Sequence, residues 1–185
     1  MSLSKGNGMQ DVIDFWFKEI DQKKWWVKNL PFDHEIQSRF GSIHKAACDN
    51  ELSSWRVSPL GRLAEVIVLD QFSRNIYRGL PESFASDPLA LKLAQEAVSI
   101  GADKELEQIQ KLFLYMPYMH SESLEVHDQA LKLFEDLGLE SNLKFEYAHR
   151  NIILKFGRYP HRNEILGRES TPEELIFLSQ PGSSF

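Results

Sequence analysis

The chain has 185 residues, a length typical of one globular domain. Hydrophobic residues make up 42% of it and charged residues 26%, a composition that supports a packed core and excludes a mainly disordered protein. The one cysteine, Cys48, excludes an intramolecular disulfide and a four-cysteine zinc site, and it favours the cytoplasm as the compartment. The net charge of -6 and the lack of a long apolar run argue against nucleic acid and membrane as partners.

Apolar residues recur at intervals of three and four along most of the chain, which predicts an all-α protein of about eight helices packed as antiparallel hairpins. Helix starts are indicated by cap residues or by the first residue of the apolar pattern, at Gln10, Asp33, Ser58, Asp87, Asp103, Ser121, Ser141 and Thr171. Helix ends are expected near Asp21, Arg74, Gly101, Pro117, Gly138, Gly157 and Leu178.

Some of these signals are sharper than others. Ser58 with Pro59 is a cap and first-turn pair, and Thr171, Pro172 and Glu174 form a capping-box pattern. Pro117 should end or kink its helix, because proline removes a backbone donor and clashes with the preceding turn. Buried stripes are expected along the helices, one of them formed by Phe145, Ala148, Ile152 and Phe156. Solvent-facing histidines are expected at His34, His44 and His127.

The expected organisation is a disordered or cloning-derived N-terminus over residues 1–8 and a single all-helical domain over 9–185. Residues 90–93 and 130–133 both read Ala-Leu-Lys-Leu, forty positions apart. Either this echo marks a helical-hairpin repeat that stacks into a superhelix, or it is a coincidence of common helix formers.

Several catalytic motifs are absent, namely the dinucleotide and phosphate-binding glycine loops, the nucleophile elbow and the zinc-protease His-Glu-x-x-His. Glu146 and His149 form one Glu-x-x-His pair, but a di-iron centre in a helical bundle needs two. We therefore expect no metal and no cofactor, and we interpret His149 as a pocket or partly buried polar residue.

Charge is unevenly placed, with a net -6 over residues 103–146 and a net +4 over 149–168. Either the acidic residues coat solvated helix faces onto which the basic segment folds, or the basic segment forms an anion pocket.

Polar side chains gather in residues 70–78, 120–122 and 156–168. If these segments converge, their arginines exceed Asp70 and Glu122 as internal counter-ions and leave donors for an anion. The binding candidates are Asp70, Gln71, Arg74, Asn75, Arg78, His149, Arg158, Arg162, Asn163 and Arg168.

The same segments resemble a bacterial family known as domain of unknown function 924. The resemblance rests on LDQFSRNIYRG at 69–79, FASDPLA at 84–90, MPYMHSE at 116–122 and FGRYPHRNEILGRESTPEE at 156–174. The chain departs from the family pattern at Ser73, where proline is common, and at Tyr159, where phenylalanine is common. The resemblance implies a tetratricopeptide-like helical fold and no established activity.

Three interpretations of the polar residues stay open. They form a binding module for a small anion or an acidic or C-terminal peptide, or they form a buried ion-pair network with a purely structural role. In the third, a metal-independent hydrolase or lyase uses His120 or His161 as general acid or base, oriented by Glu122 or Asp70. The sequence leaves the oligomeric state and the identity of the ligand open.

Overall fold

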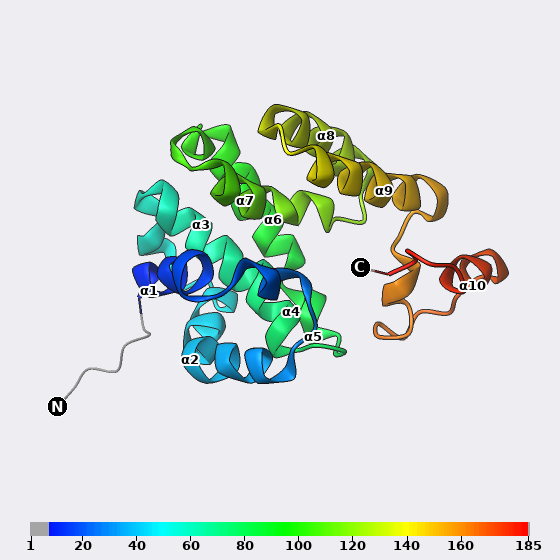
Figure 1. The fold of residues 1–185 in the computed structure, drawn as a ribbon, viewed down its shortest axis with the longest axis horizontal. Coiled ribbons are helices and arrows are strands. Elements are labelled where there is room, and N and C mark those ends of the chain that lie inside the picture. The colour runs from blue at the N-terminus through cyan, green and yellow to red at the C-terminus, as the bar shows by residue number, and fades with distance from the viewer. Residues whose placement is uncertain (1–7, 185) are drawn as a thin grey trace. The chain divides into compact units, whose positions relative to one another are not determined.

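The computed structural model describes residues 8–184, and within them the chain is helical with no strand, which confirms the all-α prediction (Figure 1). Eight α-helices of six residues or more lie in this part of the chain. None of the helices between residues 8 and 184 is both long and apolar enough to cross a bilayer. The predicted N-terminal segment, apart from Gly8, lies outside the described residues.

The chain divides into two compact units, each described here by itself. Unit 1 comprises Met1–Arg78 and Glu82–Pro117, and unit 2 comprises Gly79–Pro81 and Tyr118–Phe185. The boundary after Pro117 falls inside a helix, α7. The prediction of a single domain stays a prediction.

Unit 1 contains most of the helices. Its α-helices are α1 (Met9–Asp14), α2 (Leu30–Cys48), α3 (Pro59–Ile67), α4 (Ser73–Ile76), α5 (Glu82–Ala85), α6 (Asp87–Ser99) and most of α7 (Gln108–Met119). Shorter 3₁₀ turns cover Gln22–Trp26, Ser53–Val57 and Ala102–Glu105, and π-helical turns cover Phe15–Glu19 and Val68–Phe72. Buried aromatic rings pack together at its centre, and these are Phe15, Trp16, Phe32, Phe40 and Phe72.

The predicted cap at Ser58 is confirmed, because its hydroxyl accepts a hydrogen bond from the Gly61 amide at the start of α3. The predicted cap at Asp33 is wrong. Helix α2 begins at Leu30, where the Asn29 side chain accepts from the Phe32 amide, so Asp33 lies inside the first turn. Of the two alternatives at Pro117, an end of the helix is wrong, because α7 continues to Met119 through the proline, and a kink stays a prediction.

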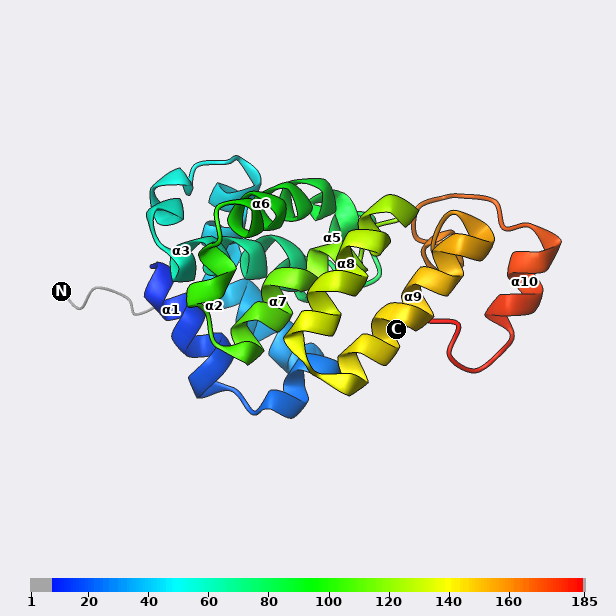
Figure 2. The same cartoon turned by 90° about the horizontal axis from the view of Figure 1, so that it is seen from above.

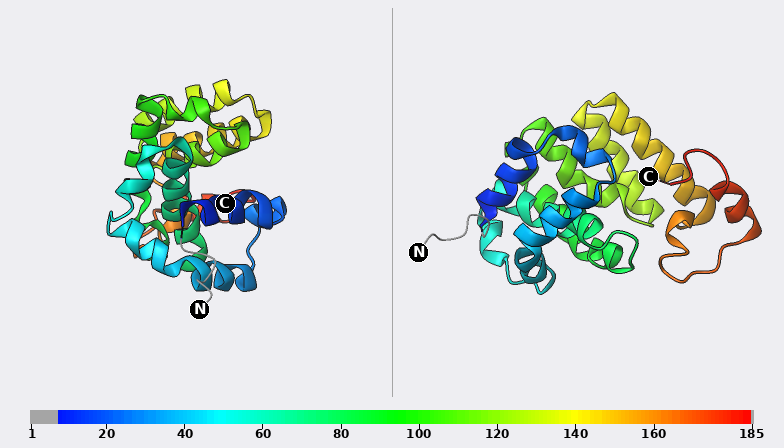
Figure 3. Two further views of the ribbon diagram at one scale, coloured as in Figure 1. Left: turned by 90° about the vertical axis from the view of Figure 1, so that its left-hand side faces the viewer. Right: turned by 60° about the horizontal axis from the view of Figure 1, so that its bottom comes forward.

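Unit 2 is built on a helical hairpin of α8 (Leu124–Leu137) and α9 (Glu140–Phe156), which lie side by side in every view (Figures 2 and 3). Gly138 follows α8 with φ 74°, a left-handed conformation that glycine adopts without strain. The chain then forms a 3₁₀ turn (Pro160–Arg162) and α10 (Pro172–Leu178). The hairpin is compatible with a tetratricopeptide-like repeat.

Two helix starts in unit 2 differ from the predictions, because α8 is preceded by Ser123 rather than Ser121 and α9 begins at Glu140 rather than Ser141. The predicted buried stripe of α9 is wrong at Phe145, which is 57% exposed, and at Ala148, which is also exposed. Glu146, His149 and Ile153 are buried instead. Helix α9 therefore turns a partly polar face inward.

Candidate functional site

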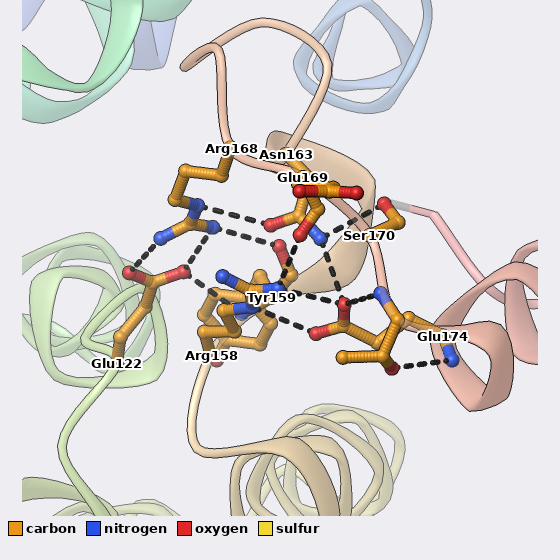
Figure 4. Close-up of polar contacts among 9 residues, drawn as sticks. Glu122, Arg158, Tyr159, Asn163, Arg168, Glu169, Ser170 and Glu174 are labelled. Atoms are coloured by element: carbon orange, nitrogen blue, oxygen red, sulfur yellow. Dashed lines mark hydrogen bonds and ion pairs between the residues drawn. The ribbon is translucent and has the colours of Figure 1, made fainter.

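A network of hydrogen bonds fixes the chain between α9 and α10, and we call it the Glu122–Glu174 network (Figure 4). Its members are Glu122, Arg158, Tyr159, Asn163, Arg168, Ser170, Thr171 and Glu174. At one end, Glu122 accepts from both terminal nitrogens of Arg168, at 2.8 and 2.9 Å, and from the Tyr159 amide at 2.8 Å. This forked pairing fixes the guanidinium in one orientation.

Glu174 forms the other end of the network, and its side chain is 3% exposed. It accepts from Nε and Nη2 of Arg158 at 2.7 and 2.8 Å, and from the Thr171 amide at 2.8 Å. The Thr171 hydroxyl in turn accepts from the Glu174 amide, which confirms the predicted capping box of α10. Asn163 joins the two ends, because it donates to Glu174 and accepts from Nε of Arg168.

Arginine partners lower the pKa of both carboxyls. For Glu122, burial alone would raise the pKa, but the hydrogen bonds from Arg168 and the Tyr159 amide outweigh it and the net shift is downward. For Glu174, the hydrogen bonds from Arg158 lower the pKa to about 2. Both groups are therefore ionised in the folded protein at neutral pH.

These shifts predict acid lability of the segment after α9. A carboxyl with a lowered pKa stabilises the folded state fully above its unfolded pKa of 4.5, and this stabilisation is lost as the pH falls towards about 2. We expect amide hydrogen exchange in α10 to accelerate between pH 4.5 and 2 beyond the intrinsic pH dependence of exchange. In Glu174→Gln this extra acceleration should be largely absent, and an unchanged profile in the variant would contradict the assignment.

A second group in unit 2, the His127–Glu146 pair, is completely buried, with both side chains 0% exposed. Nδ1 of His127 lies 2.6 Å from Oε1 of Glu146, and Nε2 lies 2.8 Å from the Ser121 carbonyl oxygen and 3.1 Å from the Tyr159 hydroxyl. The Tyr159 hydroxyl donates to the Met119 carbonyl, so Nε2 must carry a hydrogen and donate to both its neighbours. The prediction of a solvent-facing His127 is wrong.

We expect the proton between the two side chains to lie on Glu146. Burial raises the pKa of Glu146, and its Oε2 atom has no hydrogen-bond partner among the described residues. An ionised carboxylate in that position would leave a buried charge unsolvated, whereas a protonated one donates to Nδ1 of His127. Ala130 and Phe134 are buried on the same helix as His127, and this spacing is the sequence signal for its burial.

Two further histidines of the predicted site, His149 and His161, lie beside the buried ring of Tyr159. His149 donates from Nδ1 to the Phe145 carbonyl at 2.7 Å, and burial lowers its pKa to about 3. The ring centroids of His149 and His161 lie 5.8 and 5.6 Å from that of Tyr159. Arg162 stacks over the Tyr159 ring and donates to the His120 carbonyl. His149 is therefore a buried neutral residue.

The predicted residues from 70 to 78 lie in unit 1. Arg74 pairs with Asp70 and with Asp87, and Arg78 pairs with Asp33 at 2.6 Å. Gln71 donates to Asp70, and Asn75 donates to Asp33. The predicted solvent exposure of His44 is wrong, because it is 4% exposed and lies 2.7 Å from the Ser73 hydroxyl. His34 is exposed, as predicted.

The structure brings together residues 120–122 and 156–168 in unit 2, whereas residues 70–78 belong to unit 1. We predicted that the arginines of these segments would outnumber their counter-ions. This is wrong for four of them, which pair with carboxylates, namely Arg74, Arg78, Arg158 and Arg168. Three of the partners, Asp33, Asp87 and Glu174, were not counted as counter-ions in the sequence. They lie 45, 13 and 16 residues from their arginines, respectively, and such separations carry no local pattern.

A cavity of about 550 Å³ adjoins the network in unit 2. It contains two of the predicted site residues, His161 and Arg168. Its lining residues are Pro160, His161, Glu164, Arg168, Ser170, Leu175, Leu178, Ser183 and Ser184. The lining thus combines cationic, anionic, hydroxyl and aliphatic groups.

Comparison with known proteins confirms the resemblance. The family model of bacterial proteins of unknown function (DUF924) matches residues 12–182. The chain is similar to the structure of a protein of unknown function, ATU0120, from Agrobacterium tumefaciens, with 39% identity and a TM-score of 0.88. The similarity covers 92% of this chain and 96% of that one. A comparison with curated proteins found no match.

Proposed function

Because the chain belongs to this family of bacterial proteins of unknown function (DUF924), which carries no assigned activity, we propose a function from the site itself. Unit 2 is a binding module that holds a small carboxylate-bearing ligand in the cavity lined by His161 and Arg168. The observation that carries the proposal is this cavity, whose volume of about 550 Å³ lies in the range of small-molecule sites.

Arg168 is suited to bind a carboxylate because the protein already fixes its orientation. Four of its five N–H donors are used, by Glu122, Asn163 and the Tyr159 carbonyl. The fifth, on Nη1, has no partner among the described residues. A donor held in this way loses little side-chain entropy when a ligand arrives. The Ser170 hydroxyl accepts from Asn163 and keeps its own hydrogen to donate.

The Glu122–Glu174 network itself supports a structural role. Its carboxylates and guanidiniums neutralise one another, and their hydrogen bonds hold the loop that forms one wall of the cavity. In this proposal Arg158 is structural, and ligand binding rests on the residues of the cavity lining. The proposal does not extend to catalysis, because Glu122, which was expected to orient a catalytic histidine, accepts from Arg168 and the Tyr159 amide, and Asp70 lies in unit 1.

Calorimetric titration of the full chain tests this proposal. The probe is N-acetyl-L-leucine, which carries a carboxylate and an aliphatic side chain, and the reference is L-leucinamide, which lacks the carboxylate. We expect the carboxylate compound to bind, and His161→Gln to weaken its binding about tenfold, because the ring of His161 lines the cavity and the substitution changes that wall. His34→Gln, an exposed histidine in unit 1, is the matched control and should bind like the unmodified protein.

Two outcomes would contradict the proposal. One is the absence of binding by N-acetyl-L-leucine at millimolar concentration in protein whose circular dichroism shows it to be folded. The other is equal weakening by the His161 and His34 variants, because that result would place the ligand outside the cavity.

A further inference from the structure

The cavity carries a negative group that the binding of a simple anion does not explain. Glu164 lines it, is exposed, and makes no side-chain hydrogen bond or ion pair with any described residue. The positive charge of Arg168 is offset by Glu122. The unbalanced carboxylate of the lining is therefore Glu164, which would weaken the binding of a ligand that carries negative charge alone.

Arg168 and Glu164 line the same cavity. We therefore propose, resting on the proposed function, that the ligand is a free α-amino acid with an aliphatic side chain. Its carboxylate binds the remaining N–H of Arg168, and its ammonium group binds Glu164. A zwitterion satisfies both groups, whereas an anion satisfies only the arginine and a cation only the glutamate.

The turn between the two charged residues brings both to the same cavity. The Arg168 amide donates to the Asn163 carbonyl at 2.8 Å, and the Gly167 amide donates to the Glu164 carbonyl at 3.3 Å. Gly167 has φ 64°, a left-handed conformation that a residue with a side chain rarely adopts. The turn therefore reverses the chain directly after Glu164 and returns it at Arg168.

An aliphatic wall lies beside the charged groups. Leu175 and Leu178, three residues apart on α10, share one face of the helix and both line the cavity. Leu175 is 58% exposed although it is hydrophobic. An aliphatic side chain of the ligand would cover it and remove apolar surface from water.

Titration with three matched compounds tests the inference on the full chain. L-Leucine carries both charged groups, N-acetyl-L-leucine lacks the ammonium, and L-leucinamide lacks the carboxylate. We expect L-leucine to bind about fivefold more tightly than N-acetyl-L-leucine, the gain from one solvent-accessible ion pair. Glu164→Gln should abolish this preference. Glu169→Gln makes the same charge change at an exposed residue outside the lining and should keep it.

The outcomes separate this inference from the proposed function. If N-acetyl-L-leucine binds as tightly as L-leucine, or if the preference survives in Glu164→Gln, the amino acid assignment is overturned and carboxylate binding stands. If neither compound binds, both proposals are overturned. If L-leucinamide binds as tightly as L-leucine, the carboxylate is not recognised and both the proposed function and the zwitterion are wrong.

Discussion

Glu174→Gln is expected to lower the free energy of unfolding by about 3 kcal/mol, the cost of removing one partner from a buried ion pair. The Glu174 side chain is 3% exposed and accepts from Arg158, Asn163 and the Thr171 amide. Glutamine has nearly the same shape, but its amide nitrogen is a donor and must face at least one other donor. The guanidinium of Arg158 would also lose its counter-ion.

Urea denaturation followed by far-ultraviolet circular dichroism measures this effect. Glu173→Gln is the matched control, because Glu173 is the preceding residue of the same helical turn and is exposed. We expect the control to change the free energy of unfolding by less than about 1 kcal/mol, the scale of a surface charge near a helix start. Similar losses in the two variants would show that the network contributes nothing beyond surface electrostatics.

The sequence predicted the helices well where local chemistry decides the structure. The cap at Ser58 and the capping box at Thr171 depend on residues within three positions, and both are present. The predicted start of α2 was wrong because two residues of the cap type, Asn29 and Asp33, lie four positions apart near it. Asn29 caps α2 because Pro31 needs no amide donor in the first turn, and this releases Asp33 for a distant arginine.

The sequence identified many of the residues of the candidate site but not the ion pairs that they form. The motifs identified the arginines and Glu122, whereas the partners Asp33, Asp87 and Glu174 depend on tertiary contacts. The cavity was missed for the same reason, because its apolar wall comes from α10 and its charged residues from the preceding turn. His127 is the opposite case. Its helical spacing with buried apolar residues of α8 indicates burial, but histidine is polar and was therefore predicted to face solvent.

Glu146→Ala is expected to cost about 4 kcal/mol, because it leaves a cavity and an unpartnered Nδ1 atom on His127 in a fully buried position. Glu146→Gln is expected to cost less than about 1 kcal/mol. A protonated carboxyl and a primary amide have similar shapes, and the amide can donate to Nδ1 as the carboxyl hydrogen does. A strong difference between the two variants is therefore expected if Glu146 is the proton donor of the pair.

Urea denaturation of both variants measures the difference, with Glu140→Ala at the exposed start of α9 as the control for helix propensity. Infrared difference spectra provide an independent readout, since a protonated Glu146 gives a carbonyl band that disappears in Glu146→Gln. If glutamine costs as much as alanine and the band is absent, the pair is ionic, with the charge on His127 neutralised by Glu146. In that case the unpartnered Oε2 atom would need a buried water to solvate it, because a carboxylate oxygen without a donor is not tolerated in a dry interior.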